Sequence, residues 1–299
     1  FTLHLPNIPM RGVWRWLSDF GDHSHAPSMQ ARQWLLDVGR VAAPRITTIP
    51  HGVDPSRFTW AEPADRLHAR AKLKLSAERT IAGFVGRFAP QKNPFWALDL
   101  AAALKAEDRE QLVVMMGSGP DEAAMRKRIE AERLETHIRV LQFGDPLPLY
   151  QACNMLILPS RAEGFALSCT EAMSVGRPVL RTRTAGAEEQ VIEGVTGQTV
   201  PIDREAFVGR AMAMLSDVDR LADMGRAAAD HVRHHLRFET QVDRTVALYE
   251  YLAGRRTKLA DDFDWGAVAE RQPIEGDAEA SSEAEAGSER DDRITSDDP

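Results

Sequence analysis

The sequence has very little cysteine: Cys153 and Cys169 are the two in 299 residues. Their spacing fits no zinc site, and two cysteines cannot make the disulfide framework of a small secreted domain. This scarcity favours a reducing compartment. We therefore expect both thiols to be small packing residues in the interior.

Long hydrophobic runs are also missing. No stretch approaches the roughly 18 consecutive apolar residues of a membrane span, and the start of the sequence has no basic region followed by a hydrophobic signal segment. The sequence therefore predicts a soluble protein.

An excess of basic charge is absent as well. The formal charge is −8, but residues 259–299 hold 14 acidic residues against 3 arginines, so the rest of the chain is near +3. Nucleic acid as the main partner would need a concentrated basic face, and a nearly neutral body argues against it.

Between residues 81 and 182 the sequence alternates short apolar runs with amphipathic stretches. Short runs with little polar alternation are typical of strands that are buried on both faces. Strands and helices in strict alternation predict an α/β fold with a parallel, doubly wound sheet. The predicted strands are 81–86, 112–116, 138–143, 155–159 and 178–182.

Helices are predicted between and after these strands. Asn93 is expected to cap a helix at 95–105 that has Pro94 at its first position, and Pro120 with Asp121 to start one at 122–134. A further helix runs through 170–175 and ends at Gly176. After residue 199 the predicted helices are 205–215, 219–233 and 238–253.

A strand at 46–49 and the turn-rich segment 50–55 place a domain boundary near residue 43. Residues 1–43 are predicted to be the remnant of another α/β lobe, with strands at 1–5 and 23–26 and helices at 11–20 and 29–38. Residues 44–255 form a lobe with closing helices. Residues 256–299 are predicted to form an acidic, largely disordered tail. Because residue 1 is Phe and the chain opens on a strand-like run, we expect the first lobe to be truncated.

Ligands of open α/β sheets bind beyond the carboxyl ends of the strands, so the loops there are informative. The loop 86–92 follows the first predicted strand and contains Gly86, Arg87 and Lys92. The guanidinium and the ammonium group could grip a diphosphate, or they could remain solvated loop cations.

Two more loops give weaker signals. Gly117 and Gly119 follow the strand at 112–116, where glycines let a backbone approach a flat ligand or simply turn the chain. Phe143 ends the strand at 138–143, where a base could lie against the backbone. Both loops are equally consistent with ordinary turns.

The segment 163–173 carries the strongest signal. Glu163 lies in a loop and Glu171 in the first turn of a predicted helix, whose N–H groups from Ala166 to Ser168 would point at a bound anion. Carboxylates there suit the hydroxyls of a ribose and a sugar. Ser168 and Glu171 also match a capping box, which explains that pair without any ligand, and the two interpretations can coexist.

Together these loops resemble the C-terminal lobe of the retaining family-4 glycosyltransferases, which have the GT-B architecture of two Rossmann-like lobes. The resemblance covers nearly all of residues 1–255. Each motif is weak alone, but the set in order is specific. The matching segments are 49–54, Gly86 and Arg87 with Lys92, 117–120, 143–144, 163–173, 176–179, 186–189 and 194–197.

The resemblance implies a role for each matching residue. Arg87 and Lys92 neutralise the donor diphosphate, Glu171 accepts from the ribose hydroxyls, and Glu163 faces the transferred sugar. His4 matches the acceptor-lobe histidine beside that sugar, or is an ordinary histidine at a strand end. The implied donor-binding residues are Gly86, Gly117, Gly119, Phe143, Gly164, Phe165, Ala166, Leu167, Ser168 and Glu171.

Two positions depart from the pattern of the family. Ala166 and Ala187 stand where glycine is common. Ala166 narrows the space over the sugar, so the identity of the donor does not follow from the resemblance.

The implied function is transfer of a hexose-type sugar from a nucleotide-diphosphate sugar to a glycan or lipid-linked acceptor, with retention of configuration, in polysaccharide or glycoconjugate synthesis. Arg87, Lys92 and a helix N-terminus would meet the charge of the leaving group, so neither a metal nor a cofactor is expected. The resemblance implies a location in the cytoplasm and is compatible with association with the inner face of the membrane.

Other functions remain open: a non-catalytic nucleotide-sugar-binding module, or a GT-B epimerase or phosphorylase. The sequence does not predict the oligomeric state. With the first lobe truncated, we expect the chain alone to bind a nucleoside diphosphate but to transfer sugar poorly.

Overall fold

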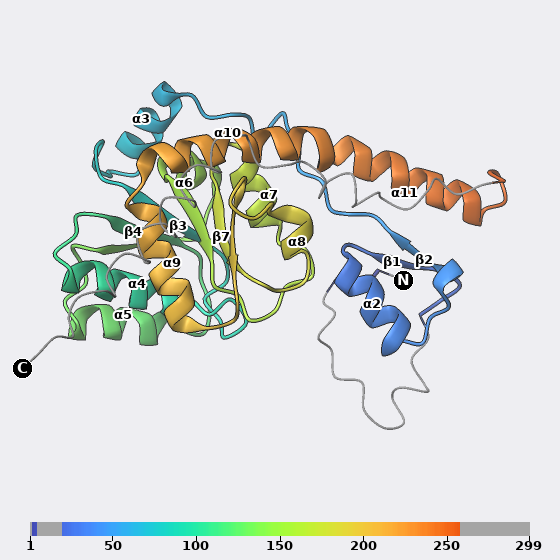
Figure 1. Cartoon of the computed structure of the whole chain (residues 1–299), viewed down its shortest axis with the longest axis horizontal. Helices are drawn as coiled ribbons and strands as arrows, with labels where there is room; N and C mark the ends of the chain where they lie inside the picture. Colours follow the sequence, from blue (N-terminus) through green and yellow to red (C-terminus); the bar gives the residue numbers. More distant parts are fainter. Residues whose placement is uncertain (1, 5–19, 258–299) are drawn as a thin grey trace, which may run out of the picture. The chain divides into compact units, whose positions relative to one another are not determined.

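The computed structural model describes residues 2–4 and 20–257. Its main feature is a parallel six-stranded sheet in the order β5-β4-β3-β6-β7-β8, with helices on both faces (Figure 1). The predicted α/β class and doubly wound sheet are confirmed. The strands are β3 (Ile81–Val85), β4 (Leu112–Met116), β5 (Ile138–Leu141), β6 (Met155–Leu158), β7 (Val179–Thr182) and β8 (Gly197–Val200).

The strand order contains a reversal. The chain runs from β3 outward through β4 to β5, then returns to the other side of β3 and continues through β6, β7 and β8. β3 and β6 are therefore neighbours at the point where the direction changes, and Ala82 and Gly83 pair with Met155 and Leu156 there. Ligands of such sheets bind at this switch point, beyond the carboxyl ends of the strands.

Both faces of the sheet are apolar, because alternate residues of each strand point to opposite sides. Phe84 and Met115 belong to a large core with α4 (Phe95–Ala106), α5 (Glu122–Ala131) and α9 (Arg204–Leu215). Ile81 and Val114 pack on the other side against Leu149 of α6 (Leu147–Ala152). This two-sided burial is why the strands read as uninterrupted apolar runs.

The remaining helices of this sheet complete its layers. α3 packs on α6, and α7 packs on α10. Gly176 has φ +82° and ends α7, as the sequence predicts. These helices are α3 (Pro63–Lys72), α7 (Leu167–Ser174), the one-turn α8 (Ala187–Gln190), α10 (Val218–His235) and α11 (Phe238–Leu252).

Before this sheet the chain forms a small parallel pair, β1 (Ser24–Ala26) with β2 (Ile46–Thr48), joined through α2 (Met29–Asp37) and a 3₁₀ turn at Ala43–Arg45. Leu3 N–H donates to the His25 carbonyl at 3.0 Å, so residues 2–4 lie beside β1. The predicted strand at 23–26 and helix at 29–38 are confirmed. The predicted helix at 11–20 falls almost wholly outside the described residues, and the disordered tail falls outside them except at 256–257.

Several local predictions are wrong. Asn93 does not cap α4: it is buried with φ 51°, and Pro94 takes the cap position. Asparagine tolerates this left-handed conformation, so it turns the chain instead. α5 ends at Ala131 rather than 134, because Arg133 takes φ 52° and Leu134 N–H returns to the Ile129 carbonyl.

Four elements were not predicted: α3, α6, α8 and β8. α6 and α8 are too short for a helical period to show. α3 buries Ala69 and Arg70 rather than a stripe of large apolar residues, and β8 has the polar sequence of residues 197–199.

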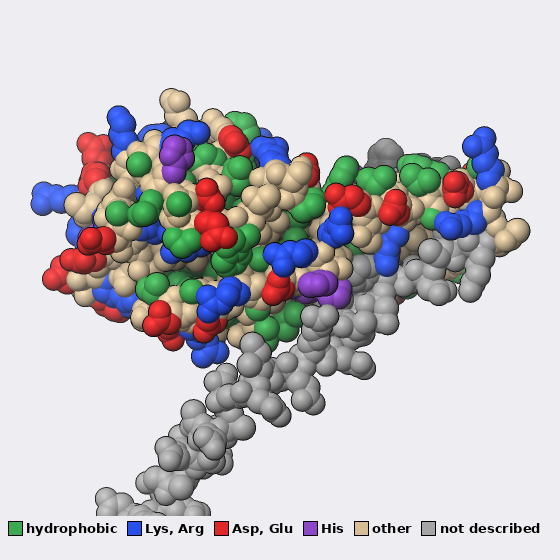
Figure 2. Space-filling view, turned by 90° about the horizontal axis from the view of Figure 1, so that it is seen from above, with side chains coloured by type: hydrophobic (Ala, Val, Ile, Leu, Met, Phe, Trp, Pro, Cys, Tyr) green, Lys and Arg blue, Asp and Glu red, His purple; other side chains and the backbone are tan. Residues whose placement is uncertain are grey.

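The surface agrees with a nearly neutral body, since acidic and basic side chains are interspersed over the face in Figure 2. Cys153 and Cys169 are free and buried, as predicted. Within the described residues, no helix has both the length and the apolarity that crossing a membrane requires.

Candidate functional site

Two loops meet at the switch point of the sheet. Lys92 follows β3, Glu163 follows β6, and Lys92 Nζ lies 2.6 Å from Glu163 Oε1. The Glu163 side chain is 7% exposed and that of Lys92 is 24% exposed, so this is a largely buried ion pair. The structure thus brings together two predicted catalytic residues that are far apart in the sequence.

Hydrogen bonds to backbone carbonyls also fix the same two loops. Arg161 N–H donates to the Gln91 carbonyl at 2.7 Å, and the Gln91 side chain donates to the Ala162 carbonyl at 3.0 Å. The position of Lys92 relative to Glu163 therefore does not depend on the ion pair alone.

Arg87 lies in the loop after β3 and is exposed. In the described part of the chain its side chain has no hydrogen bond or ion pair. Its neighbour Phe88 is buried and ties the loop to the one after β4, through Phe88 N–H to the Ser118 carbonyl at 2.9 Å. A fixed backbone thus carries an unpaired guanidinium.

Gly117 and Gly119 have a structural reason to be glycine. A Cβ on Gly117 would lie 2.0 Å from the Gly86 carbonyl oxygen, and one on Gly119 would lie 2.3 Å from that of Phe88. These glycines let the loops after β3 and β4 pack together, which favours the turn and packing explanation over direct approach to a ligand. Gly86 itself has ordinary room for a Cβ.

The N-terminus of α7 opens beside Glu163. Ala166 is the cap residue, and no side chain caps the helix. Cys169 N–H donates to the Ala166 carbonyl, while Leu167 and Ser168 precede the first N–H groups that have acceptors within the helix. Their N–H groups and the helix dipole give this end positive potential. Gly164 and Phe165, which lead into the helix, are buried.

The predicted capping box is not formed. Ser168 is the second residue of α7 rather than its cap, and Glu171 lies in the second turn rather than the first. Glu171 Oε2 instead accepts a hydrogen bond of 2.8 Å from the Tyr150 hydroxyl. No bond to Oε1 of Glu171 occurs within the described residues, so that oxygen is able to accept from a ligand hydroxyl.

Burial raises the pKa of Glu171, while the Tyr150 hydrogen bond and the charge of Arg57 oppose that rise and Asp145 adds to it. Arg57 and Asp145 form an exposed ion pair of 3.0 Å. Phe143, two residues before Asp145, is 76% exposed and therefore offers an open ring face.

Three histidines, His4, His25 and His51, form a cluster beside the loop that leads into α7. The His51 ring stacks on that of His4 at 5.9 Å between centroids, and meets Phe165 edge-on at 5.9 Å and His25 at 6.2 Å. His4 is thus placed, through His51, next to the loop to which the resemblance assigns the sugar.

Burial, with the charges of His25 and His4, lowers the pKa of His51 to about 4. Burial also lowers the pKa of His25, and the charge of His4 adds to that effect, while the hydrogen bond of 2.7 Å between His25 Nε2 and the Ile49 carbonyl oxygen opposes it. His51 is neutral at physiological pH, and its Nδ1 accepts from the Gln241 side chain at 3.3 Å.

Sequence reasoning did not assign roles to Tyr150, His25 or His51. His51 lies in the matching segment 49–54 and follows the carboxyl end of β2, where the rule for strand ends applies. The contact of Tyr150 with Glu171 spans 21 positions and leaves no local pattern.

Comparison with known proteins identifies the family. The sequence model of the family "Glycosyl transferases group 1" matches residues 65–231. D-inositol 3-phosphate glycosyltransferase 2 of Catenulispora acidiphila is 33% identical over 200 residues, which are 62% of this chain and 46% of that protein. The corresponding enzyme of Nocardia farcinica is 32% identical over 213 residues, or 68% and 46%. The chain spans about half the length of these curated relatives.

Solved structures share the fold. A glycosyltransferase from Rickettsia africae superposes with a TM-score of 0.73 at 20% identity, covering 85% of this chain and 70% of that one. Anabaena HepE, in complex with UDP and glucose, gives 0.69 at 22% identity, with 78% and 63% covered. Since the family model matches more than half of its residues, the chain belongs to the group 1 glycosyl transferases and has the GT-B type of fold.

Proposed function

We propose that this chain supplies the donor-binding half of a glycosyltransferase that moves a hexose from a nucleotide-diphosphate sugar to a hydroxyl acceptor. The observation that carries the proposal is the Lys92–Glu163 pair, because it places a cation and a carboxylate at the switch point of the sheet, beside the open N-terminus of α7.

The diphosphate would lie between Arg87 and α7. Arg87 is unpaired within the described structure and can make two parallel hydrogen bonds to phosphate oxygens. The N–H groups of Leu167 and Ser168 supply neutral donors, and Lys92 supplies a second charge. These groups are in place before the bond to the anomeric carbon breaks, so they stabilise the charge that develops on the leaving group.

Two carboxylates would orient the rest of the donor. Oε1 of Glu171 is available for the ribose hydroxyls. Glu163, already held by Lys92, would face the transferred sugar, and the His4–His51 stack would border the same space. Retention of anomeric configuration, and independence of any metal or cofactor, are parts of the proposal that rest on the family resemblance and on these cations.

The comparisons support the donor more than the acceptor. The HepE structures hold UDP or UDP-glucose, which supports a uridine diphosphate sugar as donor. The curated relatives are named for D-inositol 3-phosphate. That name makes a soluble polyol phosphate an acceptor to test beside the glycan or lipid-linked acceptor that the sequence predicts. A location of the protein in the cytoplasm, at or near the membrane, remains a proposal.

The test is a transfer assay with radiolabelled nucleotide sugars on a protein that joins this chain to an upstream acceptor lobe. We expect transfer that falls at least about a hundredfold in Glu163→Gln, with UDP affinity nearly unchanged. The control is Glu188→Gln, at an exposed position of the one-turn α8. If the protein binds donor but neither it nor the control transfers sugar to any acceptor class, it is a binding module.

A further inference from the structure

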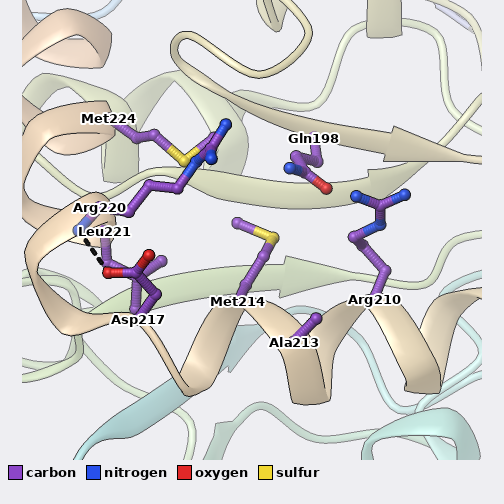
Figure 3. Close-up of a pocket in the computed structure, with 8 residues that line it drawn as sticks. All are labelled: Gln198, Arg210, Ala213, Met214, Asp217, Arg220, Leu221 and Met224. Carbon is purple, nitrogen blue, oxygen red and sulfur yellow. Dashed lines mark hydrogen bonds between the residues drawn. The ribbon is translucent and has the colours of Figure 1, made fainter. Parts of the chain in front are cut away.

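A cavity lies apart from the candidate donor site. It has a volume of about 260 Å³ and lies between the edge strand β8, the end of α9 and the start of α10 (Figure 3). α9 begins four residues after β8 ends, so its last turn, with Met214, lies away from the carboxyl end of that strand, and the cavity is therefore toward the amino end. The donor-site loops follow the carboxyl ends of strands in the same parallel sheet. The two sites therefore lie at opposite ends of the strands.

Gln198 lines this cavity with an unsatisfied polar group. It is 9% exposed, and its Oε1 is buried with no hydrogen-bond partner in the described structure. A buried polar atom without a partner is unfavourable and calls for an explanation such as a missing ligand. In Figure 3 the amide points into the space between the guanidinium groups of Arg210 and Arg220.

Both of these arginines are unpaired in the described part of the chain. Other surface arginines nearby have carboxylate partners: Arg226 pairs with Asp223, and Arg233 with Asp230. The carboxylate that lines the cavity belongs to Asp217, and its Oδ1 caps α10 by accepting from Arg220 N–H at 2.9 Å. The cavity therefore keeps an excess of positive charge.

The wall of the cavity is apolar. Met214 and Met224 are 7% and 4% exposed and come from α9 and α10. Thioether side chains are flexible and adapt to the shape of an apolar group that packs on them. Two guanidinium groups, an amide and a methionine wall together fit an anion that carries an apolar body.

We propose that this cavity binds a small organic carboxylate, whose charged group lies between Arg210 and Arg220 and whose apolar body packs on Met214 and Met224. The carboxylate accepts bidentate hydrogen bonds from guanidinium. A carboxylate cannot donate to Oε1 of Gln198, but no hydrogen bond within the described residues fixes which end of this amide is buried, so the amide can turn over and donate from Nε2 to the carboxylate. This site is independent of the proposed transfer reaction.

The test uses methyl-labelled methionine and NMR, with hexanoate as the probe. We expect saturable shifts of the Met214 and Met224 methyl signals, assigned by Met→Leu substitution. The signal of Met125, which is buried in the core on α5, should not move. Acetate lacks the apolar body and hexanol lacks the charge, so each should bind at least about fivefold more weakly.

Arg210→Gln and Arg220→Gln should each weaken hexanoate binding about tenfold, while Arg126→Gln, on α5, should leave it unchanged. Both pocket arginines are exposed, so the melting temperature of each variant should equal that of the unchanged chain. Tighter binding of inorganic phosphate than of hexanoate, equal binding of acetate, or displacement of hexanoate by UDP would each overturn the proposal.

Discussion

The Tyr150 hydroxyl donates to Glu171 Oε2 at 2.8 Å and leaves Oε1 of the same carboxylate unbonded within the described structure. One oxygen of Glu171 thus fixes the side chain, and the other is available to a ligand. This division of roles replaces the capping-box explanation and separates the stability of the site from its affinity.

Glu171→Gln should lower nucleoside affinity about tenfold, because an amide is a weaker acceptor for ribose hydroxyls than a carboxylate. Tyr150→Phe removes only the supporting bond, so it should cost about 0.5–1.5 kcal/mol of unfolding free energy and affect affinity less. Calorimetry and urea unfolding measure the two effects. A Glu171→Gln protein that is less stable but binds uridine diphosphate normally would contradict the ribose role.

Arg87→Ala and Lys92→Ala should each weaken nucleoside diphosphate binding by about 1.5–3 kcal/mol, the range for charge-assisted hydrogen bonds. Their effects on folding should differ. Arg87 is exposed and unpaired in the described structure, so Arg87→Ala should leave the free energy of unfolding unchanged. Lys92→Ala leaves the buried carboxylate of Glu163 unpaired and should therefore cost about 1–3 kcal/mol of stability. Equal diphosphate affinity in wild type and both variants would show that these residues are solvated loop cations.

Gly117→Ala should be destabilising by about 1–3 kcal/mol or more, because the added Cβ would lie 2.0 Å from the Gly86 carbonyl oxygen. The matched control is Gly144→Ala, in a loop with no atom within 4 Å of the added Cβ. Thermal unfolding of the two variants compares them. If both melt alike, the packing of the loops after β3 and β4 is not what requires glycine.

Stability should depend on pH through His51. Its pKa is about 4 in the folded protein against 6.5 for a free side chain, so between these values the unfolded chain binds a proton that the folded protein does not. The free energy of unfolding therefore falls as pH drops from about 6.5 to about 4. Because the ring is partly exposed, we expect His51 to account for about 1–2 kcal/mol.

His51→Gln should flatten that decline in the free energy of unfolding. The baseline is the free energy of unfolding of both proteins at pH 8, where His51 is neutral in the folded and the unfolded chain. The difference between the two curves isolates His51, since most other groups titrate in both proteins. Parallel curves from pH 8 to pH 4 would show that the His4–His51–Phe165 cluster is open to solvent.

Much of the fold could be predicted because β3, β4 and β6 are buried on both faces and therefore show as apolar runs. The site could be predicted only in part. The sequence predicts Lys92 and Glu163 each as a site residue, but their contact depends on β3 and β6 being neighbours, which no local pattern reveals. The sequence predicts Asn93 and Ser168 as caps, but their observed positions follow from tertiary packing: Asn93 is buried in a left-handed turn, and α7 starts at Leu167.

The central claim is that the loops after β3 and β6, with α7, bind the diphosphate of a nucleotide sugar. Its most direct test is calorimetric titration of this chain with UDP, UDP-glucose and uridine, alongside the Arg87→Ala variant. We predict one site with a dissociation constant in the micromolar range for UDP, at least about tenfold weaker binding of uridine, and a loss of at least about tenfold in Arg87→Ala. If UDP does not bind, or if Arg87→Ala binds it as well as the unchanged chain does, the site proposed at the switch point is wrong.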